Sequence, residues 1–150
     1  MTIYLDDIEV GQTFAFGRYS VTREEVLDFA SRYDPQPFHL DDAAAADNPI
    51  FGRLAASGWH TAAMIMRLTV DHWREIGLAT LGASGVDELR WMKPVYPGDT
   101  LRAEAGVIAK RQSASRPGRG AVTFRTTAFN QHDEPVMCHI ANVLIPARPA

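Results

Sequence analysis

The sequence SGWHTAAMIMRLTVDHWRE, at residues 57–75, contains the longest helical pattern of the chain. Ser57 is a favourable N-cap residue, and the apolar residues after it recur at helical spacing with few breaks. We expect a helix that begins after Ser57, ends at about Glu75 and is mostly buried. A helix with so broad an apolar surface must be covered by other parts of the chain.

The remaining sequence predicts that cover. Residues Thr13–Val21 have strand character, and Thr22 with Glu25 forms a capping-box pattern for a short helix that ends near Tyr33. After the central helix, turn residues at 94–99 and 131–134 and a polar hairpin loop at 111–120 separate strand-like runs. These runs lie near Gly82–Trp91, Thr100–Lys110, Ala121–Asn130 and Pro135–Pro146. One early and four late strands around a helix predict an α+β domain.

Composition favours one ordinary soluble domain over residues 1–150, with 46% hydrophobic and 22% charged residues. A formal net charge of -3 and the lack of a long basic run argue against a nucleic-acid surface. Cys138 is the lone cysteine and the N-terminus has no signal-peptide pattern, so we expect a reducing, cytoplasmic location. No run approaches the roughly 20 apolar residues that span a bilayer, and no Cys/His cluster has zinc spacing, so we expect neither membrane insertion nor a metal.

Acid/base groups gather just before the central helix. Asp34 and His39 are separated by Pro35 and Pro37, which favour extended geometry, so we expect a rigid, non-helical loop. An alanine-rich turn at 43–46 follows. The N-terminus of the central helix, at Gly58, would present free backbone N–H groups to the same space. An acid, a base and an anion-stabilising helix end make a candidate active site.

These residues resemble the MaoC-like (R)-specific enoyl-CoA hydratase/dehydratase family of the hot-dog superfamily. Its motif reads Asp, two residues, Pro, any residue, His, then a Phe-Gly and a His-Gly step that enters the central helix. Asp34, Pro37 and His39 match that spacing, and Phe51-Gly52 matches the middle of the motif. Two positions depart from the motif: Gln36 replaces the family's Asn, and Ser57 replaces its His.

The resemblance implies a fold, an assembly and an activity. The fold is the hot-dog fold, an antiparallel five-stranded sheet wrapped around a long central helix, and the assembly is a homodimer or higher homo-oligomer with active sites at the subunit boundary. The activity is reversible addition of water to the double bond of a 2-enoyl-CoA. Coenzyme A enters as part of the substrate, and no other cofactor is implied.

Each chemical need of hydration has a candidate residue. Asp34 and His39 would jointly hold a water and exchange protons with the substrate, with the division of the proton steps left open, and the Gly58 N–H would stabilise the enolate-like oxygen. Residues that line the candidate substrate site are Phe51, Gly52, Ser57 and Trp59. For His60, just inside the helix, packing is favoured over catalysis. Coenzyme A phosphates would find their best collective partner in the basic loop at 111–119.

The same residues also have simpler structural interpretations. Asp34 could simply cap the loop, and His39 could be a half-buried structural ring. Met64, Met66 and Trp59 could line an acyl tunnel, although core packing is favoured for the methionines. The rival functions are a noncatalytic acyl-thioester binding module and a hot-dog acyl-CoA thioesterase. The thioesterase is disfavoured because the central helix has no acid before Asp71.

Overall fold

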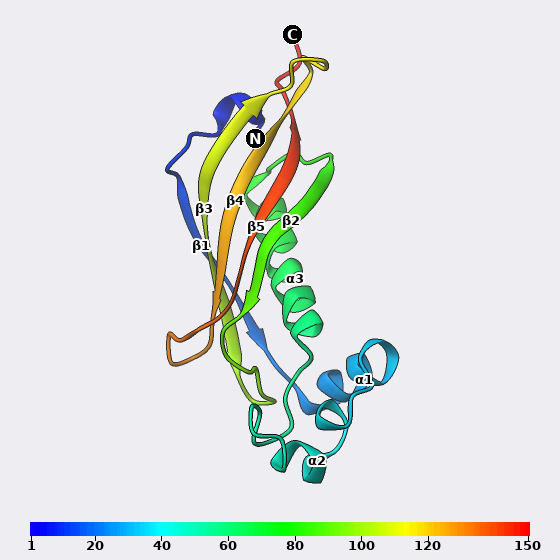
Figure 1. Ribbon diagram of the computed structural model, residues 1–150. Coiled ribbons are helices and arrows are strands. Elements are labelled where there is room, and N and C mark those ends of the chain that lie inside the picture. The colour runs from blue at the N-terminus through cyan, green and yellow to red at the C-terminus, as the bar shows by residue number, and fades with distance from the viewer.

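A five-stranded antiparallel sheet curls around one long helix in the computed structural model, which describes residues 1–150 (Figure 1). The strands are β1 (Thr13–Ser20), β2 (Gly82–Trp91), β3 (Thr100–Gln112), β4 (Arg119–Phe129) and β5 (Pro135–Pro146). The helices are α1 (Arg23–Tyr33), α2 (Asp42–Ala46) and α3 (Gly58–Ile76), with 3-10 turns η1 (Leu5–Asp7) and η2 (Pro37–His39). This is the hot-dog fold that the family resemblance implied.

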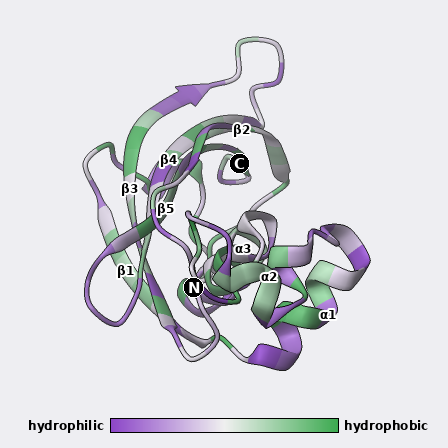
Figure 2. Ribbon diagram, turned by 60° about the horizontal axis from the view of Figure 1, so that its bottom comes forward, coloured by the Kyte–Doolittle hydropathy of each residue, from purple (hydrophilic) through white to green (hydrophobic).

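The strand order β1-β3-β4-β5-β2 places the two strands that flank α3 in sequence at opposite edges of the sheet. β3, β4 and β5 follow one another as antiparallel hairpins, whereas β2 pairs with β5 and forms a free edge of the sheet. The β3–β4 hairpin and both termini lie at one end of the molecule, and α1 and α2 lie at the other (Figure 1). Viewed from the α1–α2 end, the sheet curves around α3 (Figure 2).

Local chemistry explains where α3 begins and ends. The Ser57 hydroxyl accepts a hydrogen bond from the Trp59 N–H at 3.3 Å, as expected for an N-cap. Gly77 ends the helix with a φ of 77°, a left-handed conformation that favours glycine. One stripe of the helix is buried against the sheet and α1, but Met66 and Trp59 on other faces are 47% and 60% exposed. The prediction of a mostly buried helix was therefore wrong for the isolated chain.

Two predicted loops contain short helical turns. Residues 43–46, expected as an alanine-rich turn, belong to α2, because the Asp41 carboxylate accepts from the Ala44 N–H at 2.9 Å and caps the helix. The loop from Asp34 to His39 was expected to be non-helical, yet η2 begins at Pro37. A proline fits the first position of a helical turn because its missing N–H is not needed there.

The predicted hairpin loop at 111–120 is shorter than expected. β3 continues to Gln112, which pairs with Gly120 of β4, so the loop proper spans residues 113–118. None of the helices has both the length and the apolar character that crossing a bilayer would need.

Candidate active site

Asp34 lies at the C-terminal end of α1, where the sequence makes the helix stop. Its N–H still donates to the Ala30 carbonyl at 3.0 Å, but Pro35 disfavours the helical conformation at the residue before it. Asp34 adopts φ −151° and ψ 68° instead. The carboxylate therefore leaves the helix end and points toward η2, with its side chain 25% exposed.

His39 is the last residue of η2 and is buried, with 4% of its surface exposed. Its Nδ1 lies 2.8 Å from the Ala55 carbonyl oxygen, and because a carbonyl can only accept, Nδ1 is the donor. The other ring nitrogen, Nε2, lies 3.4 Å from Oδ2 of Asp34. The structure thus brings together the acid and the imidazole that the sequence paired, and it orients the ring through a backbone contact.

Aromatic rings cover the His39 imidazole. Phe38 meets it edge-on with ring centroids 4.6 Å apart, and Phe51 lies 5.3 Å away at an angle of 58°. The two phenylalanines also stack on each other at 5.2 Å. These rings keep bulk water from one side of the imidazole and add an apolar wall to the site.

Phe51 is held in place by two residues that the sequence analysis missed. The Asn48 side-chain oxygen accepts from the Ile50 and Phe51 N–H groups at 2.8 and 3.1 Å. The Tyr96 hydroxyl donates to the Phe51 carbonyl at 2.5 Å. Gly52 then reverses the chain with a φ of 69°. The Asn-Pro pair at 48–49 is a local turn signal for Asn48, whereas no local signal identifies Tyr96.

Gly58 is the first residue of α3, and its N–H donates to no other group of the protein. It follows Ala55, the partner of His39, by three residues, so the start of α3 adjoins the loop that holds the imidazole. A Cβ built on Gly58 would lie 2.5 Å from Cε2 of Trp91. Glycine is therefore required here by the close approach of an indole ring, and the free N–H is available to an anion.

Two other predicted substrate-site residues lie at the same helix end. The Ser57 side chain is 1% exposed and serves as the helix cap described above. Trp59 is 60% exposed and meets Trp91 edge-to-face with centroids 5.2 Å apart. The two indoles form an exposed aromatic surface beside Gly58.

His60 packs inside the fold, as the sequence analysis favoured. Its ring stacks on Phe29 with centroids 4.7 Å apart and planes 7° from parallel. Its Nδ1 is buried without a hydrogen-bond partner. Burial lowers the pKa of His60, opposed by the nearby charge of Glu25.

A separate apolar cavity of about 270 Å³ lies between the second half of α3 and the sheet. Met66, Trp73 and Ile76 of α3 contribute to its wall, together with Leu78 and Val86. Asp34, His39 and Gly58 do not line it. Within one chain, this cavity therefore lies along the second half of α3, apart from the dyad at the end of α1 and in η2.

The basic loop favoured for phosphate binding lies at the β3–β4 end of the molecule, opposite α1 and α2 (Figure 1). Within one chain, Arg111, Arg116 and Arg119 are thus far from Asp34 and His39. Two other basic residues that could bind phosphate already have acidic partners. Arg67 forms an ion pair with Asp71 at 2.8 Å, and Lys93 forms one with Glu134.

Comparison with known proteins gives a consistent result. A family model described as MaoC like domain matches residues 7–128. A MaoC-like dehydratase from Rhodospirillum rubrum has a crystal structure that superposes with a TM-score of 0.88 at 41% identity, covering 99% of both chains. The unliganded R-hydratase PhaJ1 from Pseudomonas aeruginosa superposes with a TM-score of 0.74 at 28% identity, covering 98% of this chain and 88% of that one.

One curated enzyme matches over a shorter region. The mesaconyl-CoA hydratase of Cereibacter sphaeroides is 40% identical over 74 residues, which are 49% of this chain. The match covers 21% of that enzyme's length.

Proposed function

Because the chain belongs to the MaoC-like domain family, we propose that it adds water reversibly to the double bond of a 2-enoyl-CoA thioester. At family level, hydration and dehydration of acyl thioesters are supported by relatives named as hydratases and dehydratases. The observation that carries the proposal for this chain is the geometry of His39. Its Nδ1 donates to Ala55 while its Nε2 faces the Asp34 carboxylate.

In the neutral ring, a proton on Nδ1 leaves a lone pair on Nε2. That lone pair and the Asp34 carboxylate are two acceptors 3.4 Å apart, and a water can donate one hydrogen to each of them. The pair then takes a proton from the water as its oxygen bonds to the β-carbon of the substrate. The same pair returns a proton to the α-carbon, so the protons balance over one turnover.

Attack at the β-carbon moves an electron pair from the double bond toward the thioester oxygen. The unpaired Gly58 N–H, at the positive end of the α3 dipole, would donate to that oxygen and stabilise the enolate-like charge. Phe51, Gly52, Ser57 and Trp59 would shape the surrounding site, and the product would have R stereochemistry, as the family resemblance implies.

The direct test is to incubate the purified protein with crotonyl-CoA and follow the loss of enoyl absorbance together with the release of free thiol. Loss of absorbance without thiol, yielding (R)-3-hydroxybutyryl-CoA, supports the proposal. Thiol release would make the protein a thioesterase. Binding of crotonyl-CoA without either reaction, measured by calorimetry, would make it a noncatalytic acyl-thioester module.

We also propose a homodimer that pairs through the free edge of β2. This edge strand carries Val86 at 52% exposure and Trp91 at 44%, and Met66 of α3, which lines the same cavity as Val86, is 47% exposed. An unpaired edge flanked by exposed apolar side chains favours addition of a second strand. Light scattering should give a dimer mass for the native chain and a monomer mass for Val86→Lys. A native monomer at micromolar concentration would contradict the proposal.

A further inference from the structure

A second cavity, polar and about 340 Å³ in volume, is lined by Tyr96, whose hydroxyl donates to the Phe51 carbonyl. Arg53, Lys93, Tyr96, Gln131 and His132 are among its lining residues. Most of these groups can donate hydrogen bonds, and only one of the residues that line the cavity is hydrophobic. Such a lining suits a charged, hydrated group rather than an acyl chain.

Arg53 has no anionic partner in this cavity. Its guanidinium carbon lies 3.8 Å from the centre of the Tyr96 ring, and no carboxylate lies within ion-pair distance of it. The stacking fixes the plane of the guanidinium and leaves its N–H donors free.

The two carboxylates that line the cavity are already occupied. Asp99 accepts from the Tyr96 N–H and from the Gln131 side chain, both at 2.9 Å. Glu134 contacts Lys93 and accepts from the Asn130 side chain at 3.0 Å. Arg53 is therefore the cation of the cavity whose charge is not matched by a neighbouring acid.

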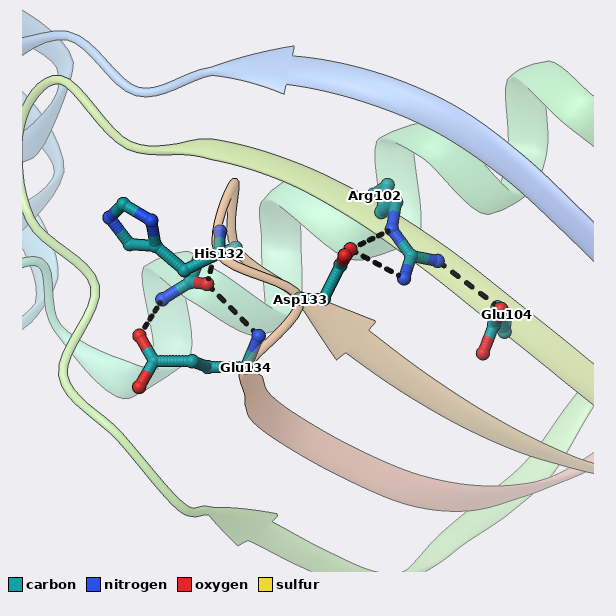
Figure 3. Close-up of polar contacts among 6 residues, drawn as sticks. Arg102, Glu104, His132, Asp133 and Glu134 are labelled. Carbon is teal, nitrogen blue, oxygen red and sulfur yellow. Dashed lines mark hydrogen bonds and ion pairs between the residues drawn. The ribbon is translucent and has the colours of Figure 1, made fainter.

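One wall of the cavity is the turn at residues 130–134, which side-chain contacts hold in place. Asp133 points away from it and is held on β3 by Arg102, with the Arg102 Nη2 3.0 Å from the Asp133 carboxylate (Figure 3). His132 and Glu134 point to the opposite side of the turn (Figure 3). Asn130 accepts from the backbone N–H groups of both residues at 3.0 and 3.1 Å. The wall is thus fixed by side-chain contacts.

The cavity is joined to the candidate active site through one residue. Tyr96, which carries Arg53 on its ring face, donates through its hydroxyl to the Phe51 carbonyl. The ring of Phe51 lies 5.3 Å from that of His39. A continuous series of contacts, from His39 to Phe51 to Tyr96 to Arg53, therefore links the imidazole to the guanidinium.

We propose that Arg53 binds a phosphate group of the thioester's carrier. This inference rests on the proposed function, because coenzyme A and phosphopantetheine both carry a phosphate at the end of the pantetheine arm. The guanidinium, held by its stacking on Tyr96, would donate two parallel hydrogen bonds to phosphate oxygens. The phosphate ester is the chemistry shared by the free coenzyme and a carrier-protein arm.

The test compares three crotonyl thioesters, those of coenzyme A, 4′-phosphopantetheine and pantetheine, with native protein, Arg53→Gln and the control Arg125→Gln, at an exposed arginine of β4 that has no ion pair. Arg53→Gln should raise KM for crotonyl-CoA about tenfold or more, leave kcat unchanged and alter KM for crotonyl-pantetheine less than about twofold. Arg125→Gln should leave both KM values unchanged. An equal effect of Arg53→Gln on crotonyl-CoA and crotonyl-pantetheine would overturn the proposal.

Crotonyl-4′-phosphopantetheine shows which phosphate of coenzyme A contacts Arg53, because it has the phosphate of the pantetheine arm but lacks the nucleotide. If Arg53→Gln raises KM for this substrate as much as for crotonyl-CoA, Arg53 binds the phosphate of the pantetheine arm. If it raises KM only for crotonyl-CoA, Arg53 binds the nucleotide phosphates. Calorimetry with desulfo-coenzyme A separates this inference from the hydratase proposal. Arg53-dependent binding without hydration would leave the phosphate site standing and remove the hydratase. Hydration with no dependence of binding or KM on Arg53 would support the hydratase proposal and remove the phosphate site.

Discussion

The Nδ1 atom of His39 lies 2.8 Å from the carbonyl oxygen of Ala55. This contact fixes which nitrogen of the neutral ring carries the proton, and it directs Nε2 toward Asp34. Because the acceptor is a backbone carbonyl in the segment that leads into α3, the orientation of the imidazole is tied to the fold. The dyad is therefore set by tertiary structure, although its two members are only five residues apart.

Asp34→Asn should lower kcat for crotonyl-CoA hydration by about 10²- to 10⁴-fold, because the amide keeps the shape of the carboxylate but cannot accept a proton. The fold should be retained, since the Asp34 side chain makes no buried ion pair with a permanently charged residue. Stopped-flow absorbance with circular dichroism measures both. Asp28→Asn, on the exposed face of the same helix, is the matched control and should keep full activity. Retention of a third or more of the native kcat in Asp34→Asn would contradict the catalytic role.

Gly58→Ala should lower kcat about tenfold or more, because the new methyl group meets the Trp91 indole and shifts the N–H that faces the substrate oxygen. Removing the Trp91 indole tests whether its contact is the reason for glycine at position 58. In a Trp91→Ala background the methyl group has room, so Gly58→Ala should then cost much less than it does in the native chain. Equal losses in both backgrounds would show that the indole is not what requires glycine at this position.

Local patterns predicted much of this structure. The Thr22 and Ser57 caps and the strand runs are encoded by neighbouring residues, and the observed boundaries differ from the predicted ones by only a few residues. The pairing of Asp34 with His39 was also predictable, because the prolines between them restrict the intervening chain.

Contacts between distant residues were not predictable in this way. Tyr96 binds the Phe51 carbonyl across 45 residues, and Trp91 covers Gly58 from the end of β2. Neither contact leaves a spacing pattern in the sequence. Arg53 was not singled out for the same reason, since its distinguishing feature is the absence of an acid near it in space. The short helix α2, in contrast, had a local signal in Asp41 followed by alanines.

Acidification should destabilise the protein through histidines that are buried in neutral form. Burial lowers the pKa of His60 below its ordinary value of 6.5, so the unfolded chain binds a proton more readily than the folded one. The resulting stability is fully present above pH 6.5 and is lost as pH falls toward the folded-state pKa. Burial also lowers the pKa of His72 and His139, which adds to the trend.

His60→Phe tests this contribution, because a phenyl ring can still stack on Phe29 and the lost Nδ1 had no partner. Urea unfolding at about pH 7.5 and about pH 5.5 should show a smaller loss of stability in the variant than in the native chain. An equal loss in both proteins would mean that His60 binds its proton equally well in the folded and unfolded states.

Filling the apolar cavity should leave hydration of a short substrate intact. Ala141 lies between Phe124 and Val86 in the sheet, and all three residues line the cavity. Ala141→Leu places three more carbons in that space, which should raise stability by about 1 kcal/mol or more. Ala109→Leu, at an exposed position of β3, controls for the change in strand propensity.

Hydration of crotonyl-CoA should not be affected, because the cavity is distant from Gly58. Met66 lies at the near end of the cavity, and at 1.5 Å per residue it is about 12 Å along α3 from Gly58. Crotonyl-CoA held at Gly58 should therefore not reach the substitution. We therefore expect kcat/KM for crotonyl-CoA within about twofold of native in both variants. Loss of crotonyl-CoA hydration in folded Ala141→Leu, with Ala109→Leu unaffected, would place the reacting end of the substrate in the cavity and remove the basis for assigning the chemistry to Asp34 and His39.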